Sequence, residues 1–206
     1  MRSPALVLLS LLLLTGCSSG RPHVSLPTTA ADPALEEQLL QLNDAPALSD
    51  RRVFSSPDRT MQATPQLALC KPTSAVGPHQ LASVLAKPTA PGQAQVFEIL
   101  ASFADATVAG AAFTQADTDA RACPSYTLNG TSYRLVGLAA PHLAGASRTL
   151  QYQLTTADVV EGDHRTIALA GRHLVLITGY GRPPAGTTTA SFQAGLMVKA
   201  LARLRS

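Results

Sequence analysis

Two short turns between strand-like segments constrain the fold of this chain more than any other feature. Asn129-Gly130 favours the two-residue turn of a β-hairpin, and it separates residues 126–128 from residues 132–138. Gly171-Arg172 separates two further strand-like segments in the same way. Strands that are joined by such short turns run antiparallel. We therefore expect the second half of the chain to form an antiparallel sheet.

Hydrophobic patterning predicts the other strands and their places in the sheet. Residues 148–155 alternate between apolar and polar, so one set should face the core and the other, which includes Gln151, should face outward. Residues 173–178 are apolar on both faces, which predicts a strand near the centre of the sheet. Residues 80–86 and 94–100 also have the pattern of strands.

Three helices are predicted to pack on this sheet. The first follows the capping residue Asp32, carries a stripe of leucines and should end near residues 43–44. The second is the alanine-rich stretch 102–122, and the third follows residues 187–189 and runs to Leu204. The predicted fold class is α+β, a mainly antiparallel sheet of about five to seven strands with about three helices packed on it.

The N-terminal region predicts export. Arg2 precedes an apolar run from Ala5 to Leu14, about half of the roughly twenty residues that a spanning helix needs, which is typical of a secretory signal peptide. The run ends in Leu-Thr-Gly-Cys at residues 14–17, which resembles the lipobox of bacterial lipoproteins. That resemblance implies cleavage before Cys17 and a lipid on its thiol. The alternative is an ordinary signal peptide with an incidental cysteine.

The predicted organisation has three parts: a lipoprotein signal peptide at 1–16, the lipidated Cys17 with a flexible tether over 17–31, and a single domain over 32–206. The tether is inferred from its small, polar and proline-containing composition. The lipid anchor would hold the protein at the extracytoplasmic face of the cell membrane without spanning it. Within the domain, residues 45–78 are expected to be irregular, because they are rich in proline and serine.

Cys70 and Cys123 are the two cysteines that remain for pairing. In an exported protein an even remainder of cysteines indicates a disulfide. This bridge would close a long loop and contribute about 4 kcal/mol on a chain-entropy estimate. Two free buried thiols are the alternative.

The search for chemistry in the sequence predicts no catalytic residue, no metal site and no cofactor. The five histidines are scattered without a ligand-like pair, and we expect them on the surface or in loops. Residues 179–186 are glycine-rich but lack a Gly-Lys-Ser/Thr ending, so they predict a turn. The acidic cluster at 161–164 is interpreted as a hairpin tip. Sixteen Lys and Arg residues against thirteen Asp and Glu form no basic stripe, so no nucleic-acid partner is expected.

Several motifs together resemble the PknH-type extracellular sensor domain. Val96-Phe97 is followed, after five residues, by Phe-Ala-Asp-Ala at 103–106 and by the alanine-rich helix that leads to Cys123. Arg165, the apolar strand 173–178 and the C-terminal amphipathic helix fit the same pattern. In mycobacteria and their relatives this domain caps receptor serine/threonine kinases and also occurs in free lipoproteins.

The resemblance covers about residues 33–205, with Cys70 as its first cysteine. The chain departs from the family pattern at Ala120, where the family often has tryptophan, and in lacking a second cysteine pair. The lipobox-like segment, the absence of catalytic residues in the sequence and this resemblance together predict a membrane-anchored lipoprotein with a non-catalytic, sensor-like or ligand-binding domain, whose ligand-binding residues are not predicted. The alternative is an envelope interaction or structural module without a small ligand. The expected partners are the membrane, through the lipid anchor, and either a small ligand or an envelope protein.

Overall fold

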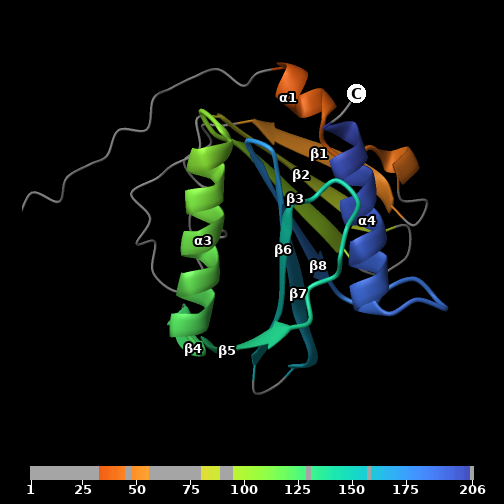
Figure 1. The fold of residues 1–206 in the computed structure, drawn as a ribbon. Coiled ribbons are helices and arrows are strands. Elements are labelled where there is room, and N and C mark those ends of the chain that lie inside the picture. Colours follow the sequence, from red (N-terminus) through yellow and green to blue (C-terminus); the bar gives the residue numbers. More distant parts are fainter. Residues whose placement is uncertain are drawn as a thin grey trace, which may run out of the picture.

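The described part of the chain folds around one antiparallel sheet with helices on both faces (Figure 1). The computed structural model describes residues 33–44, 48–55, 80–88, 95–128, 131–156 and 159–204. The helices in it are α1 (Pro33–Glu37), the 3-10 turn η1 (Leu42–Asp44), α3 (Ala106–Ala122) and α4 (Thr189–Arg203). The strands in it are β1 (Leu48–Ser55), β2 (Gln80–Pro88), β3 (Gln95–Ser102), β4 (Ser125–Leu128), β5 (Thr131–Leu138), β6 (Arg148–Thr156), β7 (Val159–Ala170) and β8 (His173–Tyr180).

The sheet has eight strands in the order β1-β2-β3-β8-β7-β6-β5-β4, so the predicted count of five to seven was wrong. The additional strand is β1, which lies within the stretch 45–78 that was predicted to be irregular. It forms an edge of the sheet and carries Asp50, Arg51 and Arg52, and charged residues are a common protection of edge strands. Among its described apolar side chains, Val53 packs against the core only in part. Residues 56–79 lie outside the described residues.

Helices cover both faces of the sheet, and each face has its own hydrophobic cluster. In Figure 1, α3 lies on one side, whereas α4 and the N-terminal α1 lie on the other. Strand β8 lies between β3 and β7, which confirms the prediction that residues 173–178 are central. Gln151 was predicted to face outward but is 7% exposed, because the α4 face is covered as well.

The two long helices begin at polar caps. The side chain of Asp105 accepts a hydrogen bond from the Val108 amide at 2.8 Å, so α3 begins after the end of β3 rather than at residue 102. Thr188 and Ser191 form a reciprocal capping box at the start of α4, within the region where the sequence predicted the cap.

The N-terminal helix is shorter than predicted. It ends at Glu37, and a turn leads into η1 instead of a continuous helix to residues 43–44. Leu35, Leu39 and Leu40 are buried, whereas Leu42 is 38% exposed. The chain leaves the helical path because sheet side chains bind the Leu40 peptide, as described below.

Both predicted hairpins are confirmed as antiparallel pairs. Leu128 pairs with Thr131 across the β4–β5 connection, whose residues 129–130 lie outside the described residues. At the β7–β8 turn, Gly171 has a φ of 56°, a conformation that favours glycine. The cluster at 161–164 lies within β7 and not at a hairpin tip, which corrects that interpretation. In the described ranges, no helix is long and apolar enough to cross a membrane.

Candidate functional site

Glu98 is a buried carboxyl group in the interior of the sheet. It lies on β3, is 1% exposed and faces the α4 side, where its neighbours in register are Val84 on β2 and Ile177 on β8. Both neighbours are fully buried and apolar. A carboxyl group in such surroundings is costly unless it is neutral or hydrogen-bonded.

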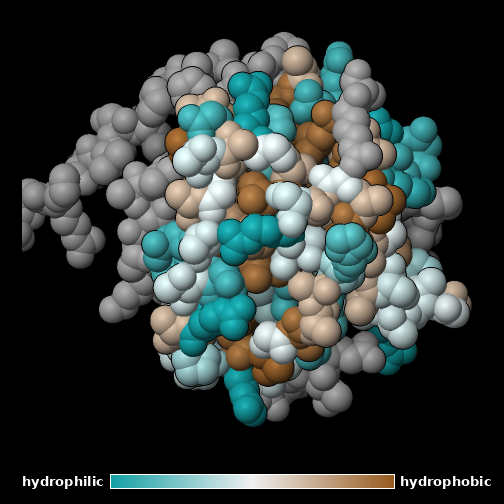
Figure 2. Space-filling model, viewed as in Figure 1, coloured by the Kyte–Doolittle hydropathy of each residue, from teal (hydrophilic) through white to brown (hydrophobic). Residues whose placement is uncertain are grey.

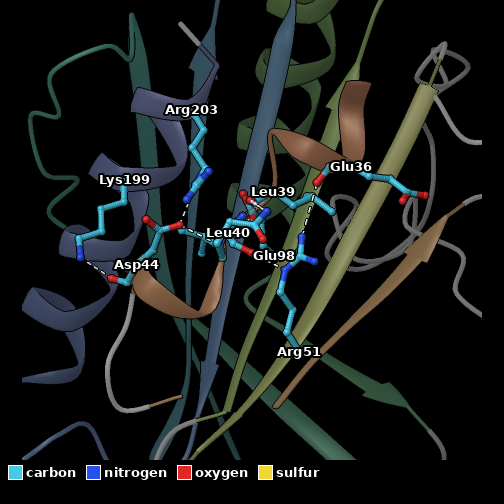
Figure 3. Close-up of polar contacts among 9 residues, drawn as sticks. Glu36, Leu39, Leu40, Asp44, Arg51, Glu98, Lys199 and Arg203 are labelled. Atoms are coloured by element: carbon cyan, nitrogen blue, oxygen red, sulfur yellow. Dashed lines mark hydrogen bonds and ion pairs between the residues drawn. The ribbon is translucent and has the colours of Figure 1, made fainter. Parts of the chain in front are cut away.

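Side chains from the sheet bind both polar groups of Leu40 (Figure 3). The Leu40 amide donates a hydrogen bond to Glu98 Oε2 at 2.7 Å, and Arg51 Nε donates to the Leu40 carbonyl oxygen at 2.7 Å. Arg51 Nη2 also donates to the Glu36 carbonyl oxygen at 3.5 Å. Glu98 and Arg51 therefore supply the hydrogen bonds that a continuous helix would otherwise have provided at Leu40.

A second set of polar contacts joins η1 to the C-terminal end of α4. Arg203 Nε donates to Asp44 Oδ2 at 2.7 Å, and the Gln41 amide donates to the same oxygen at 2.7 Å. The Lys199 ammonium donates to the Asp44 carbonyl oxygen, and Figure 3 shows this contact beside the Arg203 pair. The N-terminal segment, residues 33–44, is thus held both by the sheet and by α4.

The two carboxyl groups of this cluster respond to their surroundings in opposite ways. Burial raises the pKa of Glu98 to about 8, although the Leu40 amide and the Arg51 charge act against this rise. Burial also tends to raise the pKa of Asp44. The hydrogen bonds from Arg203 and Gln41 and the nearby positive charges outweigh it, so the pKa of Asp44 is lowered. At neutral pH Glu98 is therefore mostly protonated and Asp44 is ionised.

A different polar feature lies on the α3 face of the sheet. The Tyr152 side chain is 3% exposed, and its hydroxyl is buried without a hydrogen-bond partner among the described residues. Burial raises the pKa of Tyr152, and the positive charge of Arg165, its neighbour in register on β7, acts in the opposite direction. On the other side its register partner is Gly137, where a Cβ atom would meet only open space.

Two more tyrosines lie on this side of the sheet. Tyr126 on β4 and Tyr133 on β5 are stacked with ring centroids 5.2 Å apart and an interplanar angle of 17°. Both pack against the same hydrophobic cluster as Tyr152. The group Tyr126, Tyr133, Tyr152 and Arg165, which we call the tyrosine group, combines aromatic surface with polar atoms, as ligand sites commonly do.

The structure describes only some of the residues that the sequence singled out. Cys17 and Cys70 lie outside the described residues, and Cys123 follows the last residue of α3, with its Sγ 3.4 Å from the Ser125 carbonyl oxygen. The pairing of Cys70 with Cys123 stays a prediction. His142 is exposed in a loop as predicted, but His164 and His173 are half-buried residues of strands. No group of three metal-ligating side chains is found where the structure is described.

Sequence reasoning missed Glu98, Arg51 and Tyr152 as candidate functional residues. Glu98 stands alone between Val-Phe and Ile-Leu, and an isolated carboxylate in so apolar a run was a signal for a buried acid. Arg51 could not be recognised, because β1 itself was not predicted. Tyr152 was correctly placed in the core by the alternation of β6, but its unsatisfied hydroxyl becomes visible only in the packed structure.

The fold defines the class to which this domain is similar, that of the PknH-type extracellular domain. The crystal structure of the extracellular domain of PknH from Mycobacterium tuberculosis matches with a TM-score of 0.57 at 16% sequence identity. The match covers 87% of this chain and 100% of that one, so the predicted resemblance is confirmed at the level of the fold. An uncharacterized protein from Mycobacterium smegmatis, an Rv0999 ortholog, matches with a TM-score of 0.45 at 12% identity, over 87% of this chain and 99% of that one. No family model and no curated protein match the sequence.

Proposed function

We propose that this protein is an exported lipoprotein, anchored through Cys17, with a non-catalytic, sensor-like extracytoplasmic domain that binds a small ligand. The observation that carries the proposal is the fold it shares with the whole PknH extracellular domain. The lipobox-like segment at 14–17 supplies the anchor and the export signal. On this proposal, residues 17–31 are the tether and residues 32–206 form one domain.

The polar clusters of the fold support the proposal that the domain is not catalytic. Glu98 and Arg51 form hydrogen bonds with the backbone of the N-terminal segment, and Asp44 is paired with Arg203. These are contacts that hold a structure in place. We therefore expect the ligand of a sensor domain to bind at the tyrosine group, where Tyr152 Oη has no hydrogen-bond partner among the described residues.

The character of the surface favours a small ligand over a large docking partner. The face in Figure 2 has hydrophobic residues in small groups that are separated by polar ones. Three large apolar side chains are exposed in the described ranges, Leu42 on η1, Val136 on β5 and Val198 on α4. A protein-interaction module would instead be expected to present one contiguous apolar patch.

The anchor is tested by the Cys17→Ser variant, with Ser18→Ala as the matched control. Metabolic labelling with a fatty-acid probe should mark the wild-type and the control protein and leave Cys17→Ser unlabelled. The same two proteins should fractionate with membranes, because lipoprotein maturation supplies at least two acyl chains and two suffice for stable anchoring. Equal labelling of all three proteins would refute the anchor at Cys17.

The ligand is tested by native mass spectrometry of the protein purified from its own host. We expect a bound small molecule on the wild-type chain and a reduced occupancy in Tyr152→Phe, which removes the buried hydroxyl and keeps the ring. Val198→Ala, at an exposed position of α4 on the other face of the sheet, serves as the control. A mass equal to that of the polypeptide alone, with its anchor, would argue for the interaction module instead.

The Cys70–Cys123 disulfide is proposed as part of the same exported domain. Peptide mapping without reduction should recover the two cysteines in one cross-linked peptide pair, as exported proteins with an even number of remaining cysteines generally show. Alkylation of both thiols in the folded, unreduced protein would contradict the bridge.

A further inference from the structure

The N-terminal segment, residues 33–44, is held against the sheet at one buried ionisable point. Its three buried leucines lie in the α4-face cluster, and its Leu40 amide donates to Glu98 Oε2 at 2.7 Å. Glu98 is enclosed on both sides by the fixed strands β2 and β8, through Val84 and Ile177. The segment contacts Glu98 from outside the sheet, so it can move without breaking the pairing of these strands.

We propose that Glu98 is the proton-sensitive catch of a latch formed by residues 33–44. The segment stays docked while the Glu98 carboxyl is neutral, and it loosens when that carboxyl becomes ionised. The inference goes beyond the proposed ligand-binding function and does not depend on the lipid anchor. It concerns how the start of the domain is attached to the sheet.

The direction of the effect follows from the surroundings of the carboxyl. An ionised Glu98 would lie between two apolar side chains, and movement of the segment that covers it would give it water. Arg51 on β1 and Arg203 on α4 attract its charge, whereas Asp44 on η1 repels it. The hydrogen bond from the Leu40 amide also favours the ionised carboxyl, but burial outweighs it together with the charge of Arg51.

The other charged groups of the cluster belong to the segment or to its second attachment. Glu36 on α1 offers its carbonyl oxygen to Arg51, and Lys199 on α4 donates to the Asp44 carbonyl. Burial raises the pKa of Glu98 from 4.5 to about 8, and exposure would return it toward 4.5. The stabilisation that the neutral Glu98 carboxyl gives to the docked segment is therefore fully present below about pH 4.5. It is lost as the pH rises to about 8.

The latch occupies the point where the chain enters the domain. Residues 17–31, which the sequence predicts as a tether, immediately precede it. Release of residues 33–44 would detach the start of the described domain from the sheet and remove the contacts of Asp44 with α4. Loss of the proton from Glu98 would therefore change how the sheet is attached to the residues that precede the segment.

The experiment is hydrogen exchange of the full chain at pH 6 and pH 9, with protection factors corrected for the intrinsic exchange rate. In the wild type, the peptide that covers residues 38–44 should lose protection by about tenfold or more between the two pH values. In Glu98→Gln, which keeps an oxygen to accept from the Leu40 amide, the loss should be absent. Peptides from α3, on the opposite face, serve as the internal control and should not change in either protein.

Three results would overturn the latch: unchanged wild-type protection at residues 38–44, the same loss in Glu98→Gln, or an equal loss in α3, which would mean global unfolding. If Glu98→Gln does not fold, the latch is tested instead by NMR, through the titration of the Glu98 side-chain carboxyl carbon in the wild type. A midpoint well above the usual range of a glutamate supports the latch, and a midpoint in that range overturns it. None of these results depends on whether Cys17 carries a lipid.

Discussion

The substitution Gly179→Ala should destabilise the fold through a single neighbour, Gln193. A Cβ atom on Gly179 would lie 2.7 Å from Gln193 Nε2, which is too close for any real contact. Gln193 is fully buried on α4, donates to the His164 carbonyl oxygen at 2.6 Å and accepts from Thr166 Oγ1 at 3.3 Å. It therefore cannot move aside without giving up buried hydrogen bonds.

The magnitude follows from the groups that would lose their partners. A hydrogen bond contributes about 1 kcal/mol net, and each buried polar group left unpaired costs about 1–3 kcal/mol. We therefore expect Gly179→Ala to lower the free energy of unfolding by about 2–4 kcal/mol. Gln193→Ala removes the obstructing side chain, so in that background the added methyl should cost almost nothing. A Gly-to-Ala change in a compatible conformation is even stabilising, by about 0.4–1 kcal/mol.

The assay is urea unfolding of the wild type, both single variants and the double variant, followed by circular dichroism. The double variant should be about 2–4 kcal/mol more stable than the sum of the two single losses predicts. Additivity within about 0.5 kcal/mol would show that Gly179 and Gln193 are not coupled, and it would refute the packing of α4 on β8 described above.

Three further predictions test other parts of the structure. Because folded Glu98 holds its proton up to about pH 8 and a free glutamate only to 4.5, wild-type stability should fall with rising pH across that interval relative to Glu98→Gln. The slope should approach about 1 kcal/mol per pH unit in urea unfolding, and parallel curves would contradict the burial of Glu98. Leu196→Ala, at a 3% exposed position of α4, should cost about 2–5 kcal/mol, whereas Val198→Ala, at a 42% exposed position two residues later, should stay within about 0.5 kcal/mol. Tyr152→Phe in ligand-free protein should raise the melting temperature or leave it unchanged, since its buried hydroxyl has no described partner; a marked decrease would reveal a bond that this account lacks.

Local patterning predicted most of the sheet because its signals lie within single strands and turns. The apolar run of β8 indicated a central strand, and Asn129-Gly130 indicated the β4–β5 hairpin. Strand β1 escaped prediction because an edge strand packs weakly and carries charged residues, so its sequence resembles a loop. Its pairing with β2 is a long-range contact that no local pattern encodes.

The candidate sites were harder to predict, because they depend on which parts of the chain cover which face. A polar residue in an alternating strand is expected to face solvent, as was predicted for Gln151. Both faces of this sheet are covered, so Gln151 and Glu98 are buried instead. The break after α1 likewise results from bonds that Glu98 and Arg51 make across long sequence separations. Helix propensity alone favours a continuous helix there.

The proposed lipid anchoring of the mature protein at Cys17 can be read from the intact mass of the chain purified from membranes of its host. We expect a polypeptide that begins at Cys17 and carries a diacylglyceryl group, seen as a series of masses that differ by acyl-chain methylenes. Treatment with a lipase or alkaline deacylation should collapse this series. A chain that begins at Met1, or at any residue other than Cys17 and without lipid, would contradict the claim.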